Sequence, residues 1–482
     1  MPNSRNGVDD LGTGRRGVRR RELLAAVVAS AWAGAFAFRY VVPDRDGPAA
    51  PARTAPPTTS PPSPPSTPTG ATVTSSPMLD VRSFGARGDG RTDDTAAFSA
   101  ALAAGLEVQV PAGTYRVSPG PGGTAIPITR ASTRLRLEAG ASILLDPGDL
   151  PGASIISVSA PDVTIEGGTL IGDLAGPQLR DGEWGHGIVV GRGADRTVLS
   201  NVAVVRCWGD GIYLGGGVED VAVLECTADG NRRQGLSIVS AVRPLVSGGK
   251  FVNTGKYGRA LPGAGIDVEP NPLRGEAVVD ATIRNVELSG NTGPGLLVVG
   301  LGGRAEVEVE RSVMERNASP GVTVLGRGAS LSLTTCTSRS NHTGYLVEDT
   351  AGPVRISDCV AERNAAQGYL LKAPTTGLLG CTASGNAGSG VEFAVTARAC
   401  TLTQCTVVGN SVNGTPVPEI EVWAPATRLE KVVVRAGSPT RATYGISLRP
   451  SSAGTQVIDT SAPVGFPPGR AVSDLRPRAA TG

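Results

Sequence analysis

The chain has 482 residues, a formal net charge of +2 and a hydrophobic fraction of 40%. This balanced charge gives no reason to expect a nucleic acid as a partner. Glycine is abundant, with 66 residues, while aromatic residues make up only 4% of the chain. That composition favours tight turns around a thin core over a thick globular interior.

Residues 1–42 have the pattern of an export signal. The sequence Arg20-Arg21-Glu22-Leu23-Leu24 resembles a twin-arginine signal and opens an apolar run that ends at Phe38. Cleavage after an Ala-x-Ala site is one expectation, and an uncleaved signal anchor is the other. Both place the body of the protein outside the cell or on its surface, with membrane contact only through this segment.

Residues 43–77 are rich in proline, threonine and serine. Such a segment cannot bury a core and is expected to be an extended, semi-rigid stalk, or simply a disordered spacer. It leads into a domain predicted over residues 78–460, which is followed by a C-terminal tail at residues 461–482.

A glycine followed by alternating hydrophobic residues recurs nine times between Gly187 and Gly390. The successive spacings are 24, 24, 30, 30, 26, 23, 24 and 22 residues. A short period made of strands and turns is typical of stacked coils. Residues one and three after each glycine should point inward, and those two and four after it should face solvent. We therefore predict an all-β, single-stranded right-handed parallel β-helix. A β-propeller, the alternative, needs about 40–50 residues per blade.

Two other residue types mark the same period. An asparagine usually lies four residues before the glycine, which predicts a stack of asparagines at one corner of the coils: Asn231, Asn291, Asn317, Asn364 and Asn386. Five of the seven cysteines also share one coil position: Cys226, Cys336, Cys359, Cys381 and Cys405. We expect an inward ladder of buried free thiols rather than disulfides.

The first part of the domain carries a specific resemblance. The stretch from Asp80 to Phe98, which reads DVRSFGARGDGRTDDTAAF, and the stretch VPAGTYRV at residues 110–117 resemble the opening of pectate-lyase-superfamily β-helices. That group includes rhamnogalacturonases, polygalacturonases of glycoside hydrolase family 28 and phage tailspike depolymerases. The resemblance implies a β-helix fold and chemistry on carbohydrates. From the residues themselves, Asp93 or Asp94 should cap a short helix that contains Phe98 and closes the open end of the solenoid.

Outward polar residues concentrate on four neighbouring coils and then stop. In chain order they are Glu183, Trp184, His186, Asp210, Tyr213, Asn231, Arg232, Arg233, Gln234, Ser237, Asp267 and Glu269. The coils on either side of Gly265 are also longer, and an insertion beside a polar cluster often forms the wall of a cleft. We predict the functional site here.

Three carboxylates of this cluster are candidate catalytic residues: Asp210, Asp267 and Glu269. Asp210, Gln234 and Asp267 are expected to span two coil steps, roughly 10 Å, with Glu269 about 7 Å farther along the strand from Asp267. A gap of about 6.5–9.5 Å between two carboxyl groups suits inverting glycoside hydrolysis, in which one group donates a proton and the other activates water.

The family pattern matches only in part. Family 28 hydrolases use several aspartates on adjacent strands and a Gly-His-Gly motif, and this chain has Gly185-His186-Gly187. Its histidine coil precedes the aspartate coil, which is opposite to the family order, and the Asp-Asp pair is missing. The family's catalytic assignment therefore does not transfer.

The remaining candidates are assigned to substrate binding: Trp184, His186, Tyr213, Arg232, Arg233, Gln234, Lys256 and Tyr257. Aromatic rings can stack on sugars, although Trp184 and Tyr213 also suit packing. No metal-ligand spacing stands out, so no cofactor is predicted. A calcium ion held by loop carboxylates, as in pectate lyases, stays an alternative.

Three functions are consistent with these features. The leading prediction is an exported glycoside hydrolase that cleaves a polysaccharide. The second is a lyase or C5-epimerase acting on a uronate polymer, with the base and the cations supplied by Lys256, Tyr257, Arg232, Arg233 and His186. The third is a solenoid that binds wall polysaccharide without catalysis.

Overall fold

The computed structural model of the chain describes residues 78–146, 152–175, 183–257, 260–271, 274–412, 417–435, 445–458 and 464–465. The predicted leader and linker, residues 1–77, lie outside these ranges, as does most of the predicted tail. Among the helices of the described ranges, none has the length and apolar character needed to cross a bilayer.

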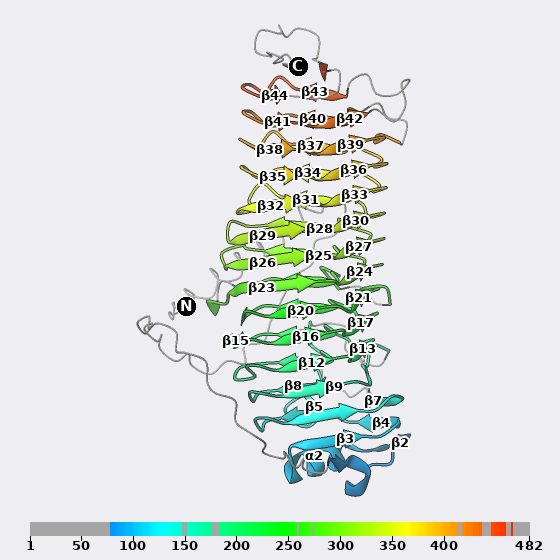
Figure 1. Ribbon diagram of the computed structural model, residues 1–482. Helices are drawn as coiled ribbons and strands as arrows, with labels where there is room; N and C mark the ends of the chain where they lie inside the picture. The colour runs from blue at the N-terminus through cyan, green and yellow to red at the C-terminus, as the bar shows by residue number, and fades with distance from the viewer. Residues whose placement is uncertain are drawn as a thin grey trace, which may run out of the picture. The chain divides into compact units, whose positions relative to one another are not determined.

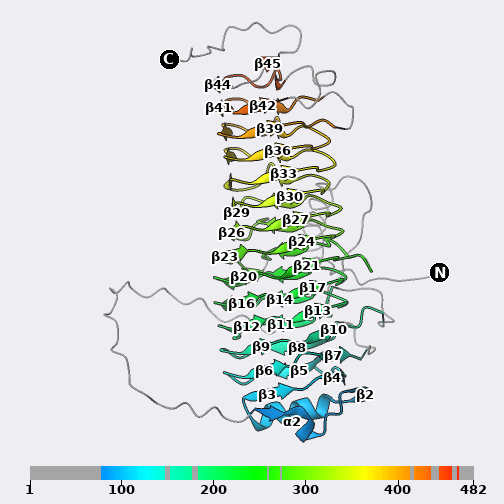
Figure 2. The same ribbon diagram turned by 45° about the vertical axis from the view of Figure 1, so that its right-hand side comes forward.

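The described chain winds into a right-handed parallel β-helix, as predicted. Successive coils stack on one another and contribute short strands to three parallel sheets (Figures 1 and 2). In the described residues, one sheet has 17 strands and the other two have 14 strands each. We name them sheets A, B and C, in the order in which the chain passes through them in each coil.

Sheet A consists of β1 (Leu79–Asp80), β3 (Glu107–Val110), β6 (Arg134–Leu137), β9 (Thr164–Glu166), β12 (Val198–Ser200), β15 (Val218–Glu219), β16 (Ala222–Leu224), β19 (Ala241–Val242), β20 (Leu245–Ser247), β23 (Val278–Arg284), β26 (Ala305–Glu310), β29 (Ala329–Thr334), β32 (Val354–Ser357), β35 (Gly377–Leu379), β38 (Thr401–Thr403), β41 (Arg428–Glu430) and β44 (Gln456–Ile458).

Sheet B consists of β2 (Asp89–Asp93), β4 (Gly113–Val117), β7 (Ala141–Leu145), β10 (Thr169–Ile171), β13 (Ala203–Val205), β17 (Thr227–Asp229), β21 (Lys250–Val252), β24 (Glu287–Ser289), β27 (Val313–Glu315), β30 (Thr337–Arg339), β33 (Val360–Glu362), β36 (Thr382–Ser384), β39 (Thr406–Val408) and β42 (Val433–Arg435).

Sheet C consists of β5 (Thr124–Ile128), β8 (Ser154–Val158), β11 (Ile188–Val190), β14 (Ile212–Leu214), β18 (Leu236–Ile238), β22 (Ile266–Val268), β25 (Leu296–Val299), β28 (Val322–Leu325), β31 (Tyr345–Val347), β34 (Tyr369–Leu371), β37 (Val391–Phe393), β40 (Ile420–Val422), β43 (Ile446–Leu448) and β45 (Val464–Gly465). Because β45 pairs with β43, sheet C continues past residue 460 into the segment predicted as a tail.

The glycine-hydrophobic repeat forms the strands of sheet C. Ile188, Ile212, Leu236 and Ile266 occupy one register row on adjacent strands, and all four are fully buried. The inward positions are therefore confirmed. The expectation that the intervening side chains face solvent is wrong on β18, β22, β25 and β28, where outward side chains are as buried as inward ones.

The predicted asparagine stack is present at the corner between sheets B and C. Asn317 shows the pattern: its Oδ1 accepts the backbone N–H of Asn291 at 3.1 Å, and its Nδ2 donates to Asn341 Oδ1 at 2.9 Å. The same bonds continue through Asn364, Asn386 and Asn410. These bonds satisfy backbone groups that the tight corner would otherwise leave buried and unpaired.

The asparagine stack has one interruption. Between Asn231 and Asn291 the corner position is occupied by Thr254, whose hydroxyl is buried without a hydrogen-bond partner. Its backbone N–H still donates to Asn291 Oδ1, at 3.0 Å. This coil leads into the strand that carries Asp267.

All seven cysteines are buried free thiols, as predicted. The ladder cysteines lie one residue before strands of sheet B, and neighbouring members are in contact: the backbone N–H of Cys336 points at Cys359 Sγ, 3.4 Å away. Two stacked tyrosines, Tyr345 and Tyr369, pack beside them with ring centroids 4.8 Å apart.

One α-helix, α2 (Thr95–Ala104), lies at the N-terminal end of the described coils, beside the 3-10 helix η1 (Val81–Phe84) (Figure 1). It buries Phe98 against Tyr115, edge to face at 5.7 Å. Asp93 accepts the backbone N–H of Thr95 at 2.9 Å, whereas Asp94 binds the backbone N–H groups of Arg87 and Gly88. The role of α2 as a cap that closes the end of the solenoid stays a prediction.

Candidate functional site

The candidate site lies on the outward face of sheet C, over β11, β14, β18 and β22. Two register rows supply it. Tyr213, Ser237 and Asp267 are direct partners at the centres of β14, β18 and β22. His186, Asp210 and Gln234 each lie two residues before the strand of their coil. Asp267 therefore belongs to a different row from Asp210 and Gln234, which corrects the expected alignment of these three residues.

Gln234 ties the two rows together. Its Nε2 donates to Asp267 Oδ2 at 2.8 Å, and its Oε1 accepts the backbone N–H of Ala264 at 2.8 Å. Both ends of the amide are thus engaged, which fixes its orientation and leaves Asp267 Oδ2 as an acceptor. The Gln234 side chain therefore positions Asp267 rather than offering itself to a ligand.

Asp267 is a buried carboxyl group beside another carboxyl group, that of Glu269. Burial raises the pKa of Asp267 well above its ordinary value, and the charge of Glu269 raises it further. Asp267 Oδ1 is buried and meets no N–H or O–H donor in the described residues. A proton on Oδ1, donated to Glu269, satisfies that oxygen, so we assign Asp267 as the protonated member of a pair that shares one proton.

Glu269 is the partner that carries the charge of this pair. Burial raises its pKa, while Arg233 opposes that shift. Because the two carboxyl groups are in hydrogen-bonding contact, the wide gap predicted between Asp267 and Glu269 is absent from this conformation. The strand places them two residues apart on one face, but their side chains converge.

Asp210 is fully buried and fully engaged. Arg233 Nη1 lies 3.2 Å from both of its oxygens, and the Ser237 hydroxyl donates to Oδ2 at 2.9 Å. Arg233 also approaches Glu183, with a nitrogen–oxygen distance of 3.6 Å. The surrounding carboxyl groups of Asp210, Glu183, Asp267 and Glu269 raise the pKa of Arg233, although burial opposes them. One guanidinium thus lies among four carboxyl groups.

His186 is neutral in this arrangement. Its Nδ1 accepts the backbone N–H of Asp210 at 3.0 Å, so the ring proton must be on Nε2. Burial lowers the pKa of His186, and the attraction of Asp210 does not overcome that effect. The 3.5 Å approach of Nδ1 to Asp210 Oδ2 is therefore not an ion pair. Nε2 is buried and has no partner in the described residues, which leaves one N–H donor for a ligand.

Aromatic rings line the end of the cluster near β11 and β14. The His186 and Tyr213 rings are stacked with centroids 5.0 Å apart, and Trp184 meets His186 edge-on at 5.5 Å. Burial raises the pKa of Tyr213 to about 12, so its hydroxyl stays protonated. Trp184 is 45% exposed and gives the cluster an accessible aromatic surface.

The other predicted binding residues lie at the margin. Arg232 donates from Nε to Trp208 O at 2.6 Å and stacks over the Trp208 ring at 4.1 Å. Lys256 and Tyr257 are exposed, and the Lys256 ammonium lies 5.8 Å from the Tyr257 ring centroid. Tyr257 packs over Gly230, at the corner of a coil rather than against the carboxyl groups.

Glu183 and Ser237 contact the central groups but were not among the predicted site residues. Both were recognisable only as outward polar residues of the same coils, and nothing in their spacing distinguishes them. Gly209 is also required here, because a Cβ at that position would lie 2.9 Å from His186 Nδ1. On the next two strands, β25 and β28, the face becomes apolar: Leu297, Val299 and Leu325 cluster with Ala264. The predicted end of the polar cluster is confirmed.

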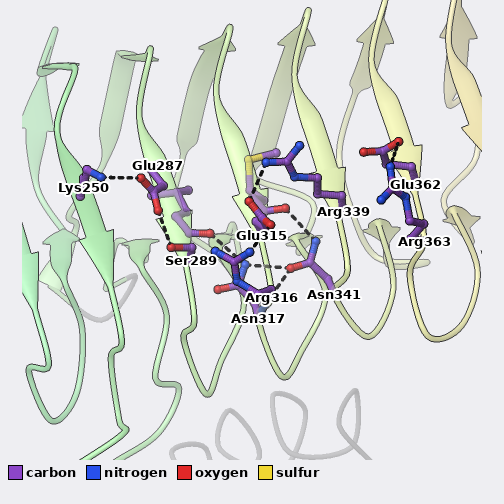
Figure 3. A network of polar contacts seen from close by, with 12 residues as sticks. Lys250, Glu287, Ser289, Glu315, Arg316, Asn317, Arg339, Asn341, Glu362 and Arg363 are labelled. Atoms are coloured by element: carbon purple, nitrogen blue, oxygen red, sulfur yellow. Dashed lines mark hydrogen bonds and ion pairs between the residues drawn. The ribbon is translucent and has the colours of Figure 1, made fainter.

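A second polar strip follows the outward face of sheet B (Figure 3). It lines a surface hollow of about 590 Å³ beside Lys250, Glu287, Glu315 and Arg339. Its charges pair with one another, as in Lys250–Glu287 at 2.9 Å and Arg339–Glu315 at 2.8 Å. Such partly exposed pairs contribute little to stability. Arg339 Nε in this strip is also buried without a partner, but hydrogen bonds from Ser289 and Lys250 lower the pKa of the strip's Glu287, whereas burial raises the pKa of Asp267 and Glu269. We therefore place the candidate site on sheet C.

The described residues contain no group of three or more histidine, cysteine or acidic side chains able to hold a metal ion. Asp267 accepts a hydrogen bond from Gln234, and Asp210 is bound by Arg233 and Ser237.

Comparisons with known proteins agree with the fold. Residues 273–457 match the family described as "Right handed beta helix region", and residues 78–121 match "Rhamnogalacturonase A/epimerase, pectate lyase-like". No curated protein sequence matches the chain.

Several solved structures are similar to this one. The pre-mature bacteriophage phi29 gene product 12 has a TM-score of 0.55 and 14% identity, over 79% of this chain and 54% of that chain. The Agl-KA catalytic domain has a TM-score of 0.50 and 13% identity, over 81% and 68%. The A-module of the Azotobacter vinelandii mannuronan C-5 epimerase AlgE4 has a TM-score of 0.43 and 18% identity, over 83% and 97%. At these identities the likeness is one of fold.

Proposed function

We propose that this chain, a right-handed parallel β-helix protein with a pectate-lyase-like N-terminal segment, is an exported glycoside hydrolase that cleaves a polysaccharide by carboxylate acid–base catalysis. One observation carries the proposal: the carboxyl group of Asp267 is buried, is oriented by Gln234 at 2.8 Å and lies beside a second acid, Glu269, and burial raises its pKa. Cleavage of a glycosidic bond requires such a proton donor at the leaving oxygen.

In the proposed reaction, Asp267 donates its proton to the glycosidic oxygen as the bond from that oxygen to the anomeric carbon breaks. A water molecule adds to the anomeric carbon, and Glu269 accepts the proton that the water loses. The two carboxyl groups touch in the sugar-free protein, so substrate entry has to part them before a water fits between. Return of the proton from Glu269 to Asp267 restores the starting state.

Asp210 is assigned a positioning role rather than an acid–base role. Its oxygens are engaged by Arg233 and Ser237, so none is free to take a proton from water. By holding Arg233, Asp210 keeps a positive charge near Glu269 and supports its ionised form. Trp184, Tyr213 and His186 would supply the surface on which a sugar ring rests.

A lyase or epimerase acting on a uronate polymer is the competing proposal. It requires cations that neutralise the uronate carboxylate, but Arg233 is held by Asp210 and Glu183, and Arg232 stacks on Trp208. Binding without catalysis is the third possibility, and it assigns no task to a protonated Asp267.

The test is a screen of the purified full chain against plant, bacterial and algal polysaccharides. Reducing ends and absorbance of unsaturated uronate products are measured together, on the wild type and on Asp267→Asn and Glu269→Gln. New reducing ends that depend on both residues support hydrolysis. An unsaturated product would assign a lyase instead, and activity unchanged in both variants would remove the site from sheet C.

A further inference from the structure

We infer that the site on sheet C takes a glycan built of sugars without carboxylate groups, either uncharged or bearing amino groups, and rejects polyuronates. This inference rests on the proposed function, since it names the substrate class of the same site. It is carried by the charges, the unpartnered donor and the aromatic surface of the cluster.

The first step is the balance of charge. Arg233 lies among the carboxyl groups of Asp210, Glu183, Asp267 and Glu269. With Asp267 protonated and His186 neutral, three carboxylates face one guanidinium, which leaves two negative charges in excess. Asp210 is fully buried, while Glu269 and Glu183 are partly exposed, so solvent screens the excess charge only in part and a uronate carboxylate brought beside it would be repelled.

The second step is that neighbouring cations do not reverse this balance. Arg274 and Glu276 both lie close enough to shift the pKa of Tyr213, and their opposite charges shift it in opposite directions. Arg232 is bound to Trp208 by a hydrogen bond and by stacking. Lys256 is exposed over Tyr257, so solvent screens its charge.

The third step is what the site offers a neutral sugar. The His186 residue is only 3% exposed. Its Nε2–H has no acceptor in the described part of the chain. A hydroxyl or ring oxygen of a sugar can fill that role without bringing charge. The stacked His186 and Tyr213 rings and the exposed edge of Trp184 add an apolar surface that suits the carbon face of a sugar.

The experiment measures binding of three oligosaccharides of equal length to the full chain by tryptophan fluorescence and calorimetry. The probes are a cello-oligosaccharide, a chito-oligosaccharide with free amino groups and an oligogalacturonate. We expect the first two to bind at least tenfold more tightly than the third at low salt. Raising the salt to about 1 M, where the screening length falls to about 3 Å, should narrow the difference.

Two matched variants test the cause. Glu183→Gln removes one of the excess charges and should raise the relative affinity for oligogalacturonate several-fold. Glu362→Gln removes a carboxylate of the same kind, paired with Arg363 at 3.4 Å on sheet B (Figure 3), and should change nothing. A preference that Glu183→Gln leaves unaltered would overturn the charge argument.

The remaining outcomes separate the two proposals. Tightest binding of oligogalacturonate, or no binding of any probe, overturns the substrate class. Cleavage of polygalacturonate by hydrolysis would overturn the substrate class but leave the hydrolase proposal standing. Binding of neutral or amino glycans with no cleavage of any polymer would count against hydrolysis while supporting the substrate class.

Discussion

Gln234 and Asp267 are joined by a 2.8 Å hydrogen bond between adjacent coils, and a second pair on sheet C repeats it. Gln367 Nε2 donates to Glu392 Oε2 at 2.7 Å, also from one coil to the next. In both pairs burial raises the pKa of the acid. The difference lies in the surroundings: Asp267 lies close to Glu269 and Arg233, whereas Glu392 lies close to Glu421, Lys372 and Arg449. The second pair therefore provides a natural control for the first.

Replacing the glutamines should separate stability from activity. Gln234→Ala and Gln367→Ala each remove a bond to a buried acid, and each should lower the free energy of unfolding by about 1–3 kcal/mol. Only Gln234→Ala should also lower kcat, by ten- to a hundredfold, because Asp267 loses its orientation. Denaturant unfolding and initial rates on the same preparations check this. Equal loss of activity in both variants would mean that the effect is one of stability alone.

Asp267→Asn should lower kcat by about 10²–10⁴-fold, the usual contribution of one acid–base group. Its stability at neutral pH should stay level or rise, because the amide replaces a buried acid that must keep a proton. Glu392→Gln is the matched control, since Glu392 also has a raised pKa on the same sheet. That variant should keep full activity, and a comparable loss there would contradict the assignment of Asp267.

The contribution of Asp267 and Glu269 to the stability of the protein should fall as pH rises from about 4 towards neutral. The pKa of Asp267 lies above its ordinary 3.8 in the folded protein, and that of Glu269 lies above its ordinary 4.5. At these two groups the folded state therefore binds more protons than the unfolded state, and deprotonation favours unfolding. The lowered pKa of His186 acts in the opposite direction. Thermal unfolding of the wild type and of Asp267→Asn tests the sign: the variant should show a flatter dependence on pH. A wild-type Tm that increases across the window faster than that of the variant would refute it.

The cysteine thiols should be unreactive towards thiol reagents in the native protein. All seven cysteines are buried, and burial raises the pKa of Cys207 and Cys226, which lowers the reactive thiolate fraction. A thiol reagent should label none of them within minutes under native conditions and all seven in denaturant. Rapid labelling of a native cysteine would show that its coil opens locally.

Asn317→Ala should be among the most destabilising single changes in the asparagine stack. Its side chain bonds Asn291, Asn341 and Leu288 O, all in buried surroundings. Leaving these partners unpaired should cost about 2–4 kcal/mol. Thr396→Ala, which removes one exposed bond to Lys372 O, is the control and should cost less than about 0.5 kcal/mol. Denaturant midpoints of the two variants decide the matter.

Much of the fold could be predicted from the sequence because every coil of a solenoid must pack against its neighbours in the same way. The glycine period, the corner asparagines and the ladder cysteines each follow from the fit of one coil on the next. The leader, the linker and the export route lie outside the described residues and stay predictions.

The candidate site was harder to predict, because the direction of each side chain decides which residues come into contact. Spacing alone placed Asp210, Gln234 and Asp267 in one line, although the strands put Asp267 in another row. It also gave no means of telling that Asp267 and Glu269 would converge, that Asp210 would be fully engaged by Arg233 and Ser237, or that Lys256 and Tyr257 would lie at the margin. The protonation of His186 depends on one backbone N–H, which no pattern of residue types reveals.

The break at Thr254 separates Asn231 from the continuous asparagine stack that runs from Asn291 to Asn410. In a stack of coils, each coil is stabilised mainly by its neighbours, so an interruption sets a boundary between units that unfold together. The boundary falls in the coil that leads to Asp267. The backbone bonds across this joint are intact, from Gly255 N–H to Asn231 O and from Thr292 N–H to Thr254 O, so the coils that carry the site stay joined by the main chain where the side-chain stack is broken.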